Sequence, residues 1–188
     1  MTLVRLVLFV HILAGVILLG HSLLSPLLLA ATRRASTLDA LRAATGLARQ
    51  ASRANPIAAF AVLASGIYLA TGRWAEAWLY TSSAQWVVSA VLSAAVVMPI
   101  DGRLHRLATA AGDGRLSEEI DTVRRSARWT VGSDAVLAGD LAVLCLMTLQ
   151  PGLVGSLLVI AGANAALPAL RAALSRRAGA ASPPRAPA

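Results

Sequence analysis

The sequence predicts an all-α fold, a polytopic bundle of transmembrane helices, from three observations. Hydrophobic residues make up 57% of the 188-residue chain and charged residues only 14%, whereas soluble domains are about one-quarter charged. Residues 6–31 run for 26 positions without a formal charge, which is long enough for a helix to cross a bilayer. The 17 basic residues are all arginines and cluster between the apolar runs, as in the loops of a membrane protein.

Apolar runs of this kind recur along the chain and predict five transmembrane helices. Pro56 suits the first turn of the second helix, and Pro151-Gly152 suits a hairpin turn before the last one. The five helices form a single domain over residues 1–177, followed by a tail at 178–188 with a composition typical of disorder. The number falls to four if the last helix does not cross. The predicted spans are residues 6–31, 56–71, 79–98, 129–150 and 153–170.

Charged segments connect the first span to the second and the third to the fourth. A serine and an aspartate three residues apart resemble a capping box, so residues 37–53 are predicted to form an amphipathic helix lying on the membrane surface. Pro99 is predicted to end the third span. Asp113-Gly114 is predicted to form a turn within the second charged segment.

The distribution of arginines predicts the orientation of the chain. Fifteen arginines lie on the side of the charged segments and the tail, against only Arg5 and Arg73 on the other side. The positive-inside rule then places the N-terminus outside and the C-terminus in the cytoplasm. We therefore expect a multi-pass protein of the bacterial inner (cell) membrane, with the lipid bilayer as its partner. A formal charge of +8 distributed in this way does not predict nucleic-acid binding.

Cysteine usage and absent motifs exclude several function classes. The single cysteine, Cys145, excludes an intrachain disulfide, a Cys-x-x-Cys redox motif and a thiolate zinc site. The chain has no phosphate-binding glycine loop, nucleophile elbow or zincin motif. We therefore do not predict an enzyme, we assign no catalytic residue, and no cofactor is firmly implied.

Small and polar residues share one face on each of two predicted helices. At about 100° per residue, His11, Ala14 and Ser22 lie on one face of the first helix. The third helix has a matching stripe that includes Gln85 and Ser89. Because small residues let helices approach closely in lipid, these faces are predicted to pack within the bundle. A homo-oligomer or a partner in a larger membrane complex is the alternative use of such faces.

Depth in the membrane predicts a pair of ionisable groups. A rise of about 1.5 Å per residue across about 30 Å of hydrocarbon puts His21 roughly 6 Å, and Asp134 about 8 Å, from the cytoplasmic boundary. The pair is predicted to be a structural contact or a proton or ligand site. Asp140 lies near mid-membrane on another face of the fourth helix. Its predicted partners are Gln85, Ser89 or Asn164.

The other histidines bear on haem binding. His11 lies about 9 Å deep in the outer half, with no acid at its level, and His105 is predicted to be a solvated loop residue. A haem held by two helices would need a second intramembrane histidine on another span, which the sequence lacks. A haem or metal held by His11 or His21 alone, or a haem shared across a homodimer, stays open.

Three short motifs are FVHILAG at residues 9–15, Arg128-Trp129 at the start of the fourth span, and LMTLQP at residues 146–151. Together they resemble an uncharacterised family of bacterial integral membrane proteins, a domain of unknown function. The pattern is also distantly similar to the copper-resistance protein D group and to the four-helix membrane protoporphyrinogen oxidases. The resemblance to the oxidases implies haem at the first-helix histidine, His11.

Three hypotheses about function follow from the polar groups. The first is a small transporter or an accessory membrane subunit whose intramembrane polar site includes His21, Asp134 and Asp140. The alternative is a haem- or metal-binding redox protein that uses His11 or His21. The third is a structural partner that packs on a larger complex through its small-residue faces.

Overall fold

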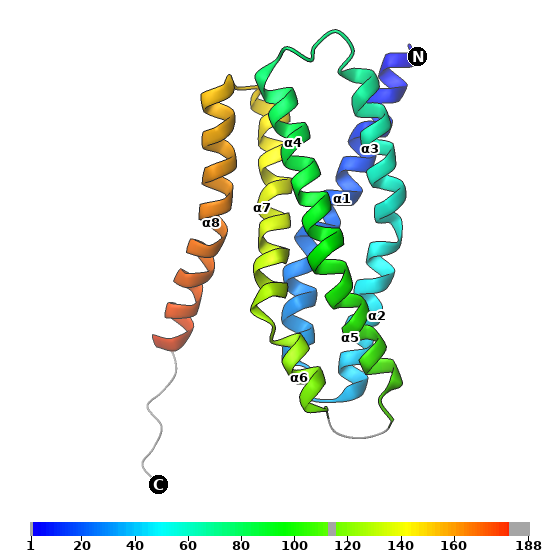
Figure 1. The fold of residues 1–188 in the computed structure, drawn as a ribbon, viewed down its shortest axis with the longest axis vertical. Helices are drawn as coiled ribbons and strands as arrows, with labels where there is room; N and C mark the ends of the chain where they lie inside the picture. The colour runs from blue at the N-terminus through cyan, green and yellow to red at the C-terminus, as the bar shows by residue number, and fades with distance from the viewer. Residues whose placement is uncertain (1, 113–115, 181–188) are drawn as a thin grey trace.

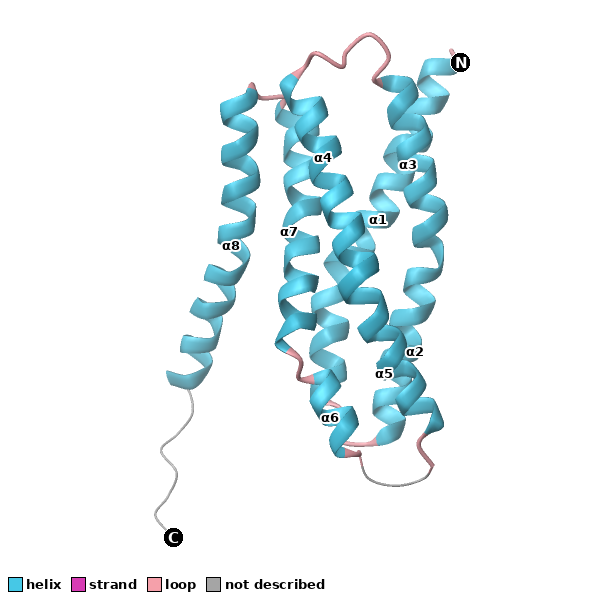
Figure 2. Ribbon diagram, in the orientation of Figure 1, coloured by secondary structure: helices cyan, strands magenta, loops and turns pink. Residues whose placement is uncertain are grey.

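The computed structural model describes residues 2–112 and 116–180, and every regular element within these ranges is a helix (Figures 1 and 2). This confirms the predicted all-α membrane bundle. The helices are α1 (Leu3–Arg34), α2 (Leu38–Ala51), the 3-10 helix η1 (Ser52–Ala54), α3 (Asn55–Leu69), α4 (Ala77–Leu92), the π-helix η2 (Ser93–Val97), α5 (Met98–Ala110), α6 (Glu118–Arg124), α7 (Ala127–Leu149) and α8 (Leu153–Ala180).

Consecutive helices join into long rods. The backbone stays helical through Ser52, Ala54 and Asn55, so α2, η1 and α3 follow one another without a loop. The helices α4, η2 and α5 join in the same way, because Leu92 and Met98 also have helical backbone angles. These rods lie alongside α1 and α7, and α8 lies outermost against α7 and α4 (Figure 1).

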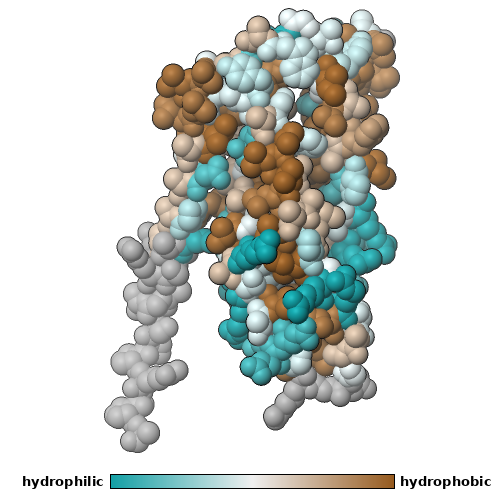
Figure 3. Space-filling model, in the orientation of Figure 1, coloured by the Kyte–Doolittle hydropathy of each residue, from teal (hydrophilic) through white to brown (hydrophobic). Residues whose placement is uncertain are grey.

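Four helices within the described ranges are long and apolar enough to cross a membrane, at residues 3–34, 77–110, 118–149 and 153–171. The predicted second span corresponds to α3, which has 15 residues and a length of about 22 Å. It reaches the usual length of a span only together with the helices that precede it. Apolar side chains cover most of the surface around these spans (Figure 3).

The charged segments gather at one end of the bundle, drawn at the bottom in Figures 1 and 3, which we call the arginine-rich end. It contains the end of α1 and the helices α2, α5 and α6. The prediction that residues 37–53 lie on the membrane surface is wrong. α2 runs alongside α1 and packs on both α1 and α5, because its apolar face finds other helices to cover it rather than lipid.

The hydrophobic core lies at this end. Leu41, Leu104 and Ile120 are almost completely buried there, on α2, α5 and α6. The hydrophobic effect drives such packing where water is the alternative. In the apolar spans, lipid competes equally well for large side chains, so small residues make the helix contacts instead. The burial of Ala14, Ser22, Ser82 and Ser89 confirms the predicted packing faces of the first and third spans.

Pro99 does not end the third span, contrary to the prediction. It occupies the first turn of α5, directly after the π-helical turn η2. The preceding Met98 N–H bonds the Ser93 carbonyl, five residues back, so the proline without an N–H falls where the hydrogen-bond register changes. The irregular turn before it lets the rod continue toward the arginine-rich end.

Two further predictions concern chain ends and turns. Gln150 ends α7 in the left-handed conformation, with φ of 48°, at the predicted hairpin. α8 continues to Ala180, so residues 178–180 of the predicted disordered tail are helical. Residues 181–188 and the predicted Asp113-Gly114 turn lie outside the described residues.

Candidate functional site

α1 and α7 bring a serine, a histidine and an aspartate together at the centre of the bundle. The hydroxyl of Ser22 on α1 donates a hydrogen bond to Asp140 Oδ2 on α7. His21, the neighbour of Ser22, lines the same cavity as Asp140. The centre of the bundle therefore carries an imidazole and a carboxyl at a depth where polar groups usually have a function or a partner.

The cavity has a volume of about 560 Å³, within the range of roughly 300–1,000 Å³ typical of small-ligand sites. Its walls come from α1, α7, the rod formed by α4 and α5, and the junction between α2 and α3. It extends from mid-bundle toward the arginine-rich end. Its ionisable lining residues are His21, Arg49, Arg53, Asp101, His105 and Asp140.

Two polar atoms in the cavity wall have no hydrogen-bond partner among the described residues. They are His21 Nδ1 and Asn55 Oδ1, both shielded from solvent. Leaving a buried polar atom unpaired costs about 1–3 kcal/mol, and native proteins keep few such atoms. Both atoms belong to residues that line the cavity, and a molecule there could bond them once a neighbouring side chain moves aside.

The charged lining residues differ in how far they are already paired. Asp140 accepts its bond from Ser22, and the Trp129 indole donates to Asp101. In contrast, the guanidinium groups of Arg49 and Arg53 make no ion pair or hydrogen bond within residues 2–112 and 116–180. The acids are thus engaged by the protein, while the arginines are available.

His105 is not the solvated loop residue that the sequence predicts. It lines the cavity from α5, and its Nδ1 lies 3.3 Å from Thr45 Oγ1 on α2. Sequence reasoning also missed Asn55 and Asp101 as lining residues. Their positions could have identified them, because Asn55 directly precedes Pro56 and Asp101 follows Pro99 by two residues. Each lies at a proline-marked end of an apolar run, where a polar side chain turns inward more readily than it faces lipid.

The predicted pair of His21 with Asp134 is wrong. Asp134 Oδ1 lies 2.6 Å from Arg171 Nη2 on α8, while His21 faces the cavity. Asp134 and Asp140 are six residues apart on α7, a rotation of about 240° around the helix, so they face different neighbours.

The predicted partners of Asp140 also need correction, because its bond comes from Ser22 rather than from Gln85, Ser89 or Asn164. Gln85 Nε2 lies 3.5 Å from Ser89 Oγ on α4, beside Gly139. Asn164 is exposed on α8 and donates to the Ile160 carbonyl of its own helix.

His11 packs between α1 and α3, outside the cavity. Its Nδ1 lies 3.0 Å from Ser65 Oγ, and a Cβ placed on Gly66 would lie 3.3 Å from the ring. The haem that the resemblance implies at His11 does not fit this close contact. His21, which faces the cavity, is the histidine of the first helix with space beside it. Within the described residues, no group of three or more His, Cys, Asp or Glu side chains is placed to hold a metal ion.

These features define a class: a polytopic helical membrane protein with a polar-lined cavity between its spans. The model of one protein family, described as predicted integral membrane protein (DUF2269), matches residues 5–151. Since the match covers well over half of the sequence, the chain belongs to this family. The matched region contains α1 to α7, and α8 follows it. No curated protein and no solved structure matches the chain.

Proposed function

We propose that the protein is a small transporter of the bacterial inner membrane that binds its ligand in the cavity between α1, α4 and α7. The positive-inside rule supports an orientation with the N-terminus outside and the arginine-rich end in the cytoplasm. Asp140 and His21, which line one cavity at the centre of the bundle, carry the proposal. Intramembrane carboxyl and imidazole groups are typical of proton-linked transporters.

The cavity supplies the parts that such a function needs. Asp140, which accepts a hydrogen bond from the Ser22 hydroxyl, binds and releases a proton. His21 offers an unpaired Nδ1 to a ligand or to a proton. A ligand that bonds His21 Nδ1 also removes the cost of leaving that atom unpaired, so binding is favoured over an empty cavity.

Charge movement after a pH jump on a solid-supported membrane tests this proposal with the proton alone as the probe. The wild-type protein is expected to give a transient current, and Asp140→Asn to reduce it on the order of a hundredfold, as for loss of a proton-transfer group. Asp39→Asn is the control, because Asp39 is 92% exposed at the arginine-rich end. A current that persists in Asp140→Asn, or no current in any sample, rejects the proposal.

A haem-binding redox function is the second candidate, favoured by one observation. His21 lines the cavity from α1, and its Nδ1 has no hydrogen-bond partner among the described residues. His21 is the residue that would hold a haem, and the iron would supply one-electron chemistry.

A further inference from the structure

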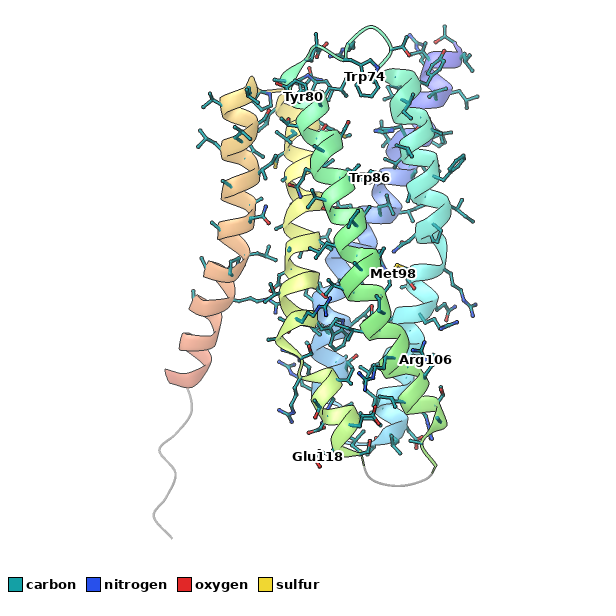
Figure 4. The ribbon with its side chains drawn as sticks, in the orientation of Figure 1. Trp74, Tyr80, Trp86, Met98, Arg106 and Glu118 are labelled. Atoms are coloured by element: carbon teal, nitrogen blue, oxygen red, sulfur yellow. The ribbon has the colours of Figure 1, made fainter. Side chains whose placement is uncertain are left out.

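Both α3 and α4 line the cavity. α3 packs chiefly on α1, and α4 chiefly on α7, so α1 is visible between them in Figure 1. Pro56 and Ala59 line the cavity from α3, Trp86 lines it from α4 and Met98 from the start of α5; Figure 4 labels Trp86 and Met98. Since both helices are apolar spans, a molecule that passes between them comes from the bilayer.

Two arginines line the cavity at the end of α2 and in η1, just before α3. Arg49 and Arg53 are exposed and line the cavity. They are one helical turn apart, so they share a face of the rod, where two like charges repel each other. An anion bound between them removes this repulsion, and within the described residues no acid of the chain does so.

The depth of the arginines matches lipid headgroups. The apolar span begins at Pro56, so Arg53 lies about 5 Å and Arg49 about 10 Å beyond it along the rod. Headgroups occupy roughly the 5–8 Å outside the hydrocarbon on each side. Arg53 therefore lies within the headgroup region, and Arg49 lies one helical turn further out, at its outer edge.

Deeper in the cavity the lining becomes apolar with a few polar atoms. Leu18, Leu28 and Val136 provide apolar surface, and the unpaired atoms of His21 and Asn55 provide bonding sites. Asp101 and Asp140 already accept hydrogen bonds from the protein, so they oppose an anion at the two arginines less than free carboxylates. The cavity thus suits a molecule with a negative head and an apolar body.

We propose that the ligand of the cavity is a membrane amphiphile with an anionic phosphate headgroup, which enters from the bilayer between α3 and α4 and is held by Arg49 and Arg53. This rests on the proposed function, because it names the ligand class of the same cavity. It adds a route of access and two specificity residues.

Quenching of tryptophan fluorescence by brominated lipids tests the proposal, because Trp86 and Trp129 line the cavity. A Trp74→Phe/Trp78→Phe background removes the signal from the opposite end. The full-length protein is placed in phosphatidylcholine vesicles with a small share of brominated phosphatidylglycerol or brominated phosphatidylcholine. We expect preferential quenching by phosphatidylglycerol, and a loss of preference of about fivefold for Arg49→Gln and about thirtyfold for Arg49→Gln/Arg53→Gln.

Arg34→Gln is the matched control, since Arg34 is exposed at the same end but outside the cavity lining, and it should keep the preference. Equal quenching by the two lipids, or a preference that survives the double variant, overturns the proposal. If excess inorganic phosphate abolishes the preference, the site takes a free phosphate and the lipid ligand is rejected. The pH-jump current is a separate measurement, so failure of the lipid proposal and failure of proton-linked transport are distinguishable.

Discussion

Arg33 and Arg124 each bond the end of the helix that carries the other. Arg33 donates from Nε to the Arg124 carbonyl at 3.1 Å and from Nη2 to the Ser126 carbonyl at 3.3 Å. Arg124 donates from Nη1 to the carbonyls of Thr32, Arg33 and Ala35. Because the last carbonyls of a helix have no partner within it, this reciprocal contact stabilises the ends of both α1 and α6.

Replacing Arg124 by methionine is expected to lower the free energy of unfolding by about 2–4 kcal/mol, since several charge-assisted hydrogen bonds are lost from buried carbonyls. Arg124 is only 6% exposed, so water does not readily replace it. The free energy of unfolding is measured by denaturant titration in mixed micelles. Arg125→Met is the control, because its side chain is 68% exposed and, among the described residues, pairs only with Asp121; it should cost less than about 1 kcal/mol. Equal losses in the two variants contradict this role of Arg124.

Gly139 lets α4 and α7 approach closely. A Cβ added there would lie 2.2 Å from Ser89 Oγ and 2.5 Å from Gln85 Nε2, so Gly139→Ala should lower stability by about 1–3 kcal/mol through overpacking. Gly20→Ala on α1 meets no atom within 4 Å and should be neutral or slightly stabilising. The same micelle titration compares the two, and a stable Gly139→Ala would show that the contact relaxes without cost.

Sequence patterns predict the positions of the helices along the chain better than they predict which side chains are in contact. Length and apolarity along the chain fix the spans, because lipid exposure imposes both. Rotation about each axis is not fixed in this way. The depth argument places His21 and Asp134 at similar levels, yet Asp134 faces Arg171 on α8, because depth does not determine which neighbour a side chain faces.

The charged segments are where sequence reasoning was least successful. Amphipathic periodicity in residues 37–53 is compatible with either a membrane surface or another helix, and only the tertiary structure shows that α2 packs on α5. The same packing brings His105 to Thr45 and the cavity. Arg42 on α2 donates a hydrogen bond to the Ala108 carbonyl at the end of α5. Some of the arginines that indicate the orientation in the membrane therefore also hold helices together.

Glu76, in the loop before α4, should make stability depend on pH. Hydrogen bonds from Arg73 and then from Trp78 hold the pKa of Glu76 below its ordinary value of 4.5. A lowered folded pKa gives stability that is fully present above the unfolded pKa and is lost as pH falls through the folded one. The difference in Tm between wild type and Glu76→Gln should therefore be constant from neutral pH down to the ordinary pKa and shrink at lower pH. A difference that grows on acidification contradicts the assignment.

An absorption spectrum from 350 to 700 nm, of protein purified from haem-supplied cells and again after dithionite, decides the haem alternative. If haem is bound, His21→Ala should abolish the Soret band, because His21 faces the cavity. His11→Ala should leave the band unchanged, because His11 is packed against Ser65 and Gly66. His105→Ala should also leave the band unchanged, because His105 lies toward the arginine-rich end, beside Thr45. A Soret band lost in His11→Ala instead would mean that α1 and α3 separate to admit the macrocycle, and a featureless spectrum leaves transport as the surviving function.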